Sequence, residues 1–155
     1  MILGLLGTLM LAASAQCDAL CSHVVAVLQA ANTQFQHVRG ERLTRTATWR
    51  GAISLVPGDY CEIRKDEKGG ALWQYQCWMQ YDTARDAEVM YQELRAAVRE
   101  AVSENVQIVE QANAGEMHAF SAVLGGRQTL RVEHVSVPDG ASLREYDVTF
   151  TVSAR

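Results

Sequence analysis

Two cysteines on either side of a Gly-Gly turn constrain the fold of this chain most. Residues 60–65 and 71–81 are predicted to form two β-strands, and the second alternates between apolar and polar side chains. If residues 68–70 form the loop between them, Cys61 falls directly opposite Cys77. We therefore expect an antiparallel hairpin whose strands are joined by a Cys61–Cys77 disulfide.

The other two cysteines, Cys17 and Cys21, are then left to pair with each other near the start of the first predicted helix. Four cysteines allow three connectivities, so pairing of Cys17 and Cys21 with Cys61 and Cys77 is the alternative. Neither pair has the CxxC spacing that is typical of zinc and redox sites. We expect structural disulfides and no bound metal ion.

The first fifteen residues form an uncharged apolar run that ends in Ala13-Ser14-Ala15. This pattern predicts a cleaved signal peptide over residues 1–15, although no basic residue precedes the apolar core. The run is shorter than the about 20 apolar residues that span a bilayer, so we expect no stable membrane insertion after cleavage. An uncleaved anchor is the alternative. The mature chain would begin at Gln16 and reside in the periplasm or outside the cell, where disulfides persist.

Composition fits a single globular domain over residues 16–155. Of the 155 residues 48% are apolar and 21% are charged, with 11 Gly and 2 Pro, which excludes disordered and collagen-like chains. A formal net charge of −4 gives no general attraction to nucleic acid, so we expect no nucleic-acid partner.

The first predicted helix spans residues 19–38 and carries no Asp, Glu, Lys or Arg. Arg39 and Gly40 are the expected last-turn cation and C-cap. Beyond its main apolar stripe, the helix presents further apolar residues at Val25 and Ala30, among others. Either other elements of the same chain cover this uncharged face, or the face meets a protein partner or a second copy of the chain.

The spacing of apolar residues along the chain predicts the remaining helix and strands. A strand is expected over residues 43–56 and a second helix over residues 84–102, opened by Asp82 or Thr83. Four further strands are predicted over residues 105–111, 116–124, 128–137 and 144–153. The order is α-β-β-β-α-β-β-β-β, which predicts an α+β fold with a mainly antiparallel sheet and both long helices packed on one face. The helix-then-strands order occurs twice, but residue identity between the halves is too low to establish a repeat.

Two surface features are the candidate binding residues. Arg39, Arg42, Arg45 and Arg50 surround Trp49, and Arg42 and Arg50 are expected on one strand face. They either bind an anionic partner or protect an exposed strand from edge pairing. Trp78 lies among Gln74, Gln76 and Gln80 on the polar face of its strand, where it is either covered by a helix or serves as an exposed anchor for a partner.

The sequence contains no phosphate loop, dinucleotide fingerprint or nucleophile elbow, so no cofactor is expected. If Gly125-Gly126 is a two-residue hairpin turn, His118 faces Glu133. This pair is the one acid–base or metal-binding candidate, and a solvated cross-strand contact is the simpler interpretation.

These observations predict an exported, non-catalytic protein that binds another macromolecule, such as an inhibitor, an immunity protein or an accessory envelope subunit. One alternative is a small-molecule or lipid carrier whose apolar pocket is lined by Trp73, Tyr75, Phe120 or Phe150. A second alternative is a small hydrolase that uses His118 and Glu133.

Overall fold

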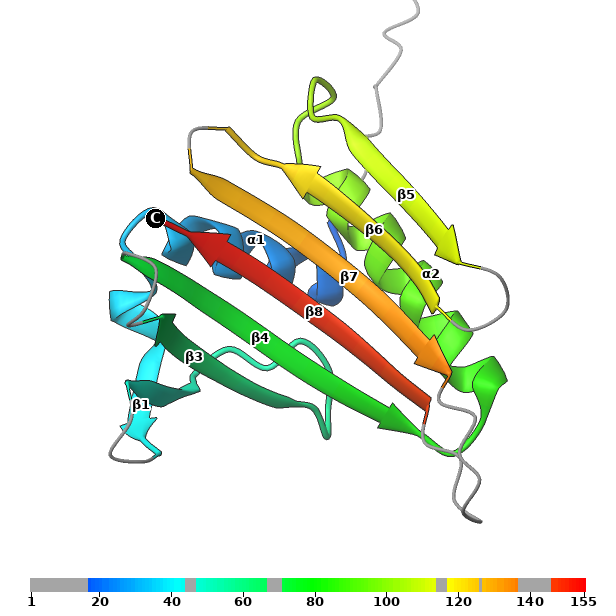
Figure 1. The fold of residues 1–155 in the computed structure, drawn as a ribbon, viewed down its shortest axis with the longest axis horizontal. Helices are drawn as coiled ribbons and strands as arrows, with labels where there is room; N and C mark the ends of the chain where they lie inside the picture. The colour runs from blue at the N-terminus through cyan, green and yellow to red at the C-terminus, as the bar shows by residue number, and fades with distance from the viewer. Residues whose placement is uncertain (1–16, 44–46, 67–70, 114–116, 126, 137–145) are drawn as a thin grey trace, which may run out of the picture.

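The computed structural model describes residues 17–43, 47–66, 71–113, 117–125, 127–136 and 146–155 (Figure 1). The predicted signal peptide lies outside the described residues. The elements are α1 (Ala19–Ala31), the 3-10 helix η1 (Gln36–Val38), β1 (Arg39–Arg42), β2 (Thr48–Gly51), β3 (Tyr60–Asp66), β4 (Leu72–Tyr81), α2 (Ala84–Ala101), β5 (Ile108–Asn113), β6 (Met117–Val123), β7 (Gln128–Ser136) and β8 (Tyr146–Ala154). Within the described residues, no helix is long and apolar enough to cross a membrane.

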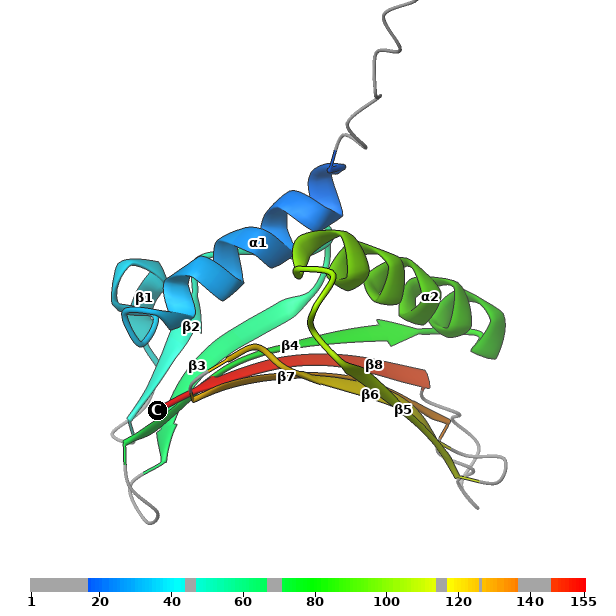
Figure 2. The same ribbon diagram turned by 90° about the horizontal axis from the view of Figure 1, so that it is seen from above.

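All the strands form one antiparallel sheet in the order β1-β2-β3-β4-β8-β7-β6-β5. Each half of the chain contributes one α-helix followed by four strands, and the halves meet where β4 pairs with β8. Both helices lie on the same side of the sheet (Figure 2). The α+β fold and the antiparallel sheet are confirmed, with one strand more than predicted in the first half.

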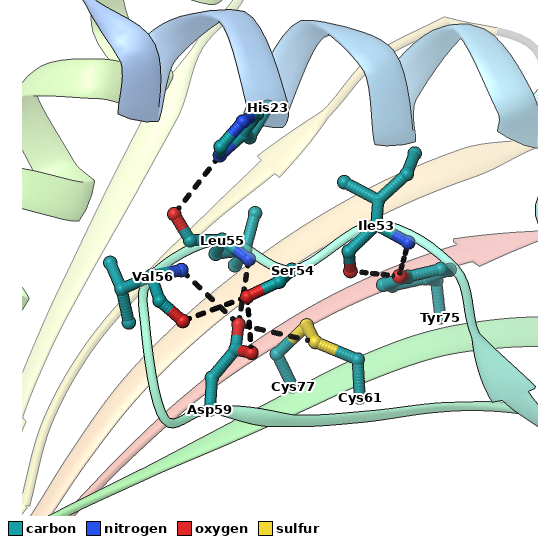
Figure 3. Close-up of a disulfide and its surroundings, with 9 residues drawn as sticks. All are labelled: His23, Ile53, Ser54, Leu55, Val56, Asp59, Cys61, Tyr75 and Cys77. Atoms are coloured by element: carbon teal, nitrogen blue, oxygen red, sulfur yellow. Dashed lines mark hydrogen bonds between the residues drawn. A yellow bond between two sulfur atoms is a disulfide. The ribbon is translucent and has the colours of Figure 1, made fainter.

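The extra strand is β1, which precedes the predicted strand over residues 43–56, and that predicted strand is shorter than expected. Thr48–Gly51 forms β2, which pairs with the unpredicted β1, and residues 52–59 then leave the sheet. At the point of departure, the hydroxyl of Tyr75 accepts a hydrogen bond from the N–H of Ile53 at 3.0 Å and donates one to its carbonyl (Figure 3). A Cβ at Gly51 would lie 2.5 Å from this hydroxyl, so a glycine is required there.

The segment 52–59 lies between the sheet and α1, and the carboxylate of Asp59 holds its turn together (Figure 3). This carboxylate accepts hydrogen bonds from the N–H of Leu55 at 2.6 Å and of Val56 at 3.3 Å. The Leu55 carbonyl in turn lies 3.1 Å from Nδ1 of His23 on α1, and the Leu55 side chain is buried. Because these bonds satisfy its polar groups, the segment can cover the core without being a strand.

The first helix is shorter than predicted, ending at Ala31 instead of residue 38. The N–H of Phe35 donates to the carbonyl of Ala30 at 2.8 Å, and both Gln34 and Phe35 adopt a left-handed backbone with φ of 54° and 61°. This reversal places the Phe35 ring in the core, 5.7 Å from the ring of Tyr75. Arg39 is therefore not in the last turn of a helix but begins β1.

The helix starts agree with the sequence. Asp18 caps α1 by accepting a hydrogen bond from the N–H of Cys21 at 2.8 Å, and Thr83 caps α2 by accepting one from Asp86 at 3.1 Å. The structure contains both expected disulfides, Cys17–Cys21 and Cys61–Cys77, with Cα atoms 5.4 Å and 4.1 Å apart.

The turn between β6 and β7 is one residue longer than predicted. The N–H of Leu124 donates to the carbonyl of Gln128, and Val123 pairs with Thr129. His118 consequently pairs with His134, while Glu133 pairs with Ala119 on the opposite face. The predicted contact between His118 and Glu133 is therefore wrong.

Loss of the Cys61–Cys77 disulfide should destabilise the fold more than loss of Cys17–Cys21. The bridges enclose sequence separations of 16 and 4, and loop entropy predicts losses of about 3 and about 2 kcal/mol in the free energy of unfolding. Urea unfolding of the Cys61→Ala/Cys77→Ala and Cys17→Ala/Cys21→Ala double variants measures both values. A larger loss of stability in the Cys17→Ala/Cys21→Ala variant than in the Cys61→Ala/Cys77→Ala variant would contradict the loop-entropy explanation.

Tyr75 should make the protein sensitive to alkali. Burial, reinforced by the charge of Asp59 and opposed by the hydrogen bond to Ile53, raises the pKa of Tyr75 from 10.0 to about 12. The unfolded chain therefore ionises first, and the contribution of Tyr75 to stability is complete below about pH 10 and lost as the pH rises to about 12. Tyr75→Phe should reduce that alkaline loss while lowering stability at neutral pH by about 1–3 kcal/mol, because the polar groups of Ile53 lose their partner.

Urea unfolding at pH 7, 9 and 11 tests this expectation, with the exposed Tyr60→Phe as control. If the Tyr75→Phe variant lost stability between pH 9 and 11 as steeply as the wild-type protein, Tyr75 would not be responsible.

Candidate functional site

The face of the sheet opposite the two helices is covered by neither of them (Figure 2). We call it the open face. Strand alternation places polar side chains on its central strands, because the apolar side chains of the same strands point to the helices. Its described members on β4 and β8 include Gln74, Gln76, Trp78, Thr149, Thr151 and Ser153.

Two aromatic rings and two arginines stack on this face. Tyr60 and Trp78 pair across β3 and β4 with their ring centroids 5.8 Å apart, and 41% of Tyr60 is exposed. The guanidinium of Arg50 lies 4.8 Å from the Tyr60 centroid, and that of Arg64 lies 5.6 Å from the Trp78 centroid. These distances are within the range of cation–π attraction.

Glu62 lies between these residues and is only 5% exposed. It pairs in register with Arg50 on β2 and with Gln76 on β4, and its carboxylate forms an ion pair with Arg64. The hydroxyl of Tyr60 donates to the same carboxylate at 3.4 Å. We call Arg50, Tyr60, Glu62, Arg64 and Trp78 the open-face cluster.

A second aromatic group lies on the helix side of the sheet. The rings of Trp49 and Trp73 are 5.4 Å apart, and the guanidinium of Arg39 lies 3.7 Å from the Trp73 centroid. Arg42 and Lys65 stack on Trp49 and Trp73 at 5.8 Å and 5.5 Å. Burial lowers the pKa of Arg39, which donates to the Gln34 carbonyl at 2.8 Å.

The structure therefore brings together three of the four binding residues singled out in the sequence. Trp78, Arg50 and Gln76 lie on the open face, whereas Arg42 is on β1 and stacks on Trp49 on the other side of the sheet. The expectation that Arg42 and Arg50 share a face is wrong, because β1 is a separate strand.

Sequence reasoning missed three members of the cluster, namely Tyr60, Glu62 and Arg64. The predicted hairpin register already contained the signal, because placing Cys61 opposite Cys77 also places Tyr60 opposite Trp78. The local sequence pattern did not reveal that Glu62 is buried, because its burial requires β2 to lie beside β3.

The uncharged face of α1 is largely occupied within the chain. Val25 and Leu28 are half-buried against the core, where α1 also meets α2. The large apolar side chains that are exposed in the described part of the chain are Tyr60, Val89, Val109 and Val123, and none of them belongs to α1.

The aromatic residues of the expected apolar pocket pack in the core. Tyr75, Phe120 and Phe150 are fully buried and Trp73 is 6% exposed. Two surface hollows of about 580 and 620 Å³ are bordered by Arg127 and Gln128, and none of the four aromatic side chains lines either hollow.

Among the described residues, one group of three metal-ligand types gathers within 4.8 Å, formed by Asp59, Cys61 and Cys77. Both sulfur atoms belong to the disulfide, so neither is a thiolate ligand. The carboxylate of Asp59 instead holds the segment 52–59 (Figure 3).

Comparison of the chain with protein-family models, curated proteins and solved structures found no match. The candidate site is accordingly defined by the geometry of the open-face cluster.

Removing Arg64 should destabilise the protein through Glu62. The Glu62 side chain is 7% exposed and the Arg64 side chain 55% exposed, so Arg64→Ala leaves a buried carboxylate without its ion pair. Because Arg64 is solvent-screened, we expect a loss of about 1 kcal/mol in urea unfolding. The double variant Arg64→Ala/Glu62→Gln should recover most of it, and Arg85→Ala on the exposed surface of α2 is the control. Equal effects of Arg64→Ala and Arg85→Ala would show that the ion pair contributes nothing.

Proposed function

We propose that this chain is an exported, non-catalytic protein that binds an acidic surface of a protein partner through the open-face cluster. The observation that carries the proposal is the partly exposed Tyr60–Trp78 pair flanked by two arginines on the uncovered face of the sheet. Inhibitors, immunity proteins and accessory envelope subunits are the classes that fit.

The composition of the cluster supports a binding role. Tryptophan, tyrosine and arginine are the residues that most often dominate binding energy at protein interfaces. Gln74, Gln76 and Thr149 supply amide and hydroxyl groups beside Trp78, as in the polar rim of an interface.

Rigidity of the site also favours binding. Trp78 lies on the central strand β4, which pairs on both sides, and the arginines are held by the rings on which they stack. Binding therefore orders few side chains, which limits the entropic cost of association.

Charge favours an acidic partner. Arg64 is paired with Glu62, but within the described chain the contact of Arg50 is with the Tyr60 ring and no ion pair of Arg50 is formed. A carboxylate of a partner would complete this contact, since arginine binds carboxylates through two parallel hydrogen bonds.

Export rests on two features. Residues 1–15 have the pattern of a signal peptide, and the two disulfides are compatible with an oxidising compartment such as the periplasm or the extracellular space. Self-association through α1 is the alternative interaction. The open face is favoured because it exposes the aromatic side chain of Tyr60, whereas no large apolar side chain of α1 is exposed.

Trp78→Ala should strongly reduce recovery of the partner. Natively exported protein with a C-terminal tag is captured from its source, eluted without reductant and quantified by mass spectrometry. Loss of a tryptophan anchor costs about 2 kcal/mol or more, so we expect partner recovery to fall at least about tenfold. Tyr60→Ala should act in the same direction, and Trp78→Phe should retain part of the binding.

Val89→Ala is the matched control, because Val89 is 49% exposed on α2, on the other side of the sheet. Equal recovery with wild-type and Trp78→Ala protein would rule out the open-face cluster as the interface. A wild-type protein that co-purifies with nothing would count against the binding function itself.

A further inference from the structure

Two histidines lie side by side at the inner face of the second half of the sheet. His118 on β6 pairs directly with His134 on β7, and their rings are nearly parallel with centroids 6.3 Å apart. The two strands are neighbours, and α2 lies across this part of the sheet (Figure 1). Tyr91 of α2 adds a third ring, 6.3 Å from His118 and 6.2 Å from His134.

His134 has one nitrogen that is partnered and one that is not. Its Nδ1 lies 3.2 Å from Oε2 of Glu88 on α2, whereas its Nε2 is buried and has no hydrogen-bond partner among the described residues. The side chain is only 6% exposed. In the tautomer whose Nδ1–H donates this hydrogen bond to Glu88, Nε2 carries the lone pair, which is the form of imidazole that binds metal ions.

We propose that His118 and His134 bind a divalent transition-metal ion such as Zn²⁺, with Glu88 orienting His134 and water completing the coordination. A carboxylate that accepts a hydrogen bond from a metal-binding histidine is the usual outer partner of such ligands, because it fixes the tautomer and increases the basicity of the ring. Glu88 holds that position relative to His134.

The two rings stack at an interplanar angle of 26°, and an ion is not held between their faces, because the lone pair of an imidazole nitrogen lies in the plane of its ring. Binding therefore requires His118 to turn until its lone pair and that of Nε2 of His134 meet at one ion, with each nitrogen about 2.0–2.1 Å from zinc. His118 is exposed, so its ring can rotate toward Nε2 of His134 without disturbing the core and the ion can enter from solvent.

A metal ion would also resolve the one unfavourable feature of this cluster. A buried polar nitrogen without a partner is uncommon in folded proteins, and Nε2 of His134 would gain a ligand bond in place of the missing hydrogen bond. The ion would join β6 to β7, and through Glu88 it would link both strands to α2.

The test is a Zn²⁺ titration of tag-free, chelator-treated protein against a chromophoric competitor. We expect one equivalent to bind, His118→Ala and His134→Ala each to weaken binding more than about tenfold, and Glu88→Ala to weaken it about 10- to 100-fold. The control is His37→Ala, which removes an exposed histidine of η1. This variant should bind zinc as tightly as the wild-type protein does.

Co²⁺ substitution provides a second readout, because its visible absorption reports histidine ligation and should disappear in His118→Ala. Since His118 is exposed, this variant keeps the proposal testable even if His134→Ala fails to fold. Wild-type protein that takes up no zinc, or His118→Ala protein that takes it up as tightly as wild type, would overturn the proposal. Trp78→Ala should retain full zinc binding, so the result is independent of the proposed protein partner.

Discussion

The pairing of β4 with β8 unites the two halves of the molecule in one sheet and one core. It runs from Trp73 opposite Ala154 to Tyr81 opposite Tyr146 and joins two halves that each consist of a helix and four strands. At its centre Cys77 faces Phe150, and both side chains are fully buried beneath the helices. Without this pairing each half would have a four-stranded sheet with an unprotected central edge, and the core would be divided in two.

The same pairing also separates the two faces of the sheet. Because successive residues of a strand point in opposite directions, burying Tyr75 and Cys77 under the helices forces Gln76 and Trp78 onto the open face. The candidate binding surface is therefore a direct consequence of the core. Its rigidity follows from lying on strands that are paired on both sides, which is what an interface with small ordering costs requires.

The histidine pair shows how strongly register decides which side chains meet on a sheet. A turn between β6 and β7 that is one residue longer than the Gly-Gly pattern predicts replaces Glu133 with His134 opposite His118. It also moves Glu133 to the open face, where Arg131 is its partner at 2.6 Å. A pair of one acid and one base thus becomes a pair of potential metal ligands, and the acidic group beside it, Glu88, comes from a helix distant in sequence.

The features that depend on near neighbours follow from the local sequence pattern. Alternation and turn residues gave β3 and β4 with Cys61 opposite Cys77, and capping residues with a 3.6-residue period gave α2. The tertiary structure alone decided that α1 ends at Ala31, because Gln34 and Phe35 adopt a left-handed backbone that burial of the Phe35 ring stabilises. It also decided that residues 52–59 leave the sheet, because their hydrogen-bond partners, Tyr75 and His23, come from distant parts of the chain. Such contacts have no local pattern, since their energy arises only when separate elements pack together.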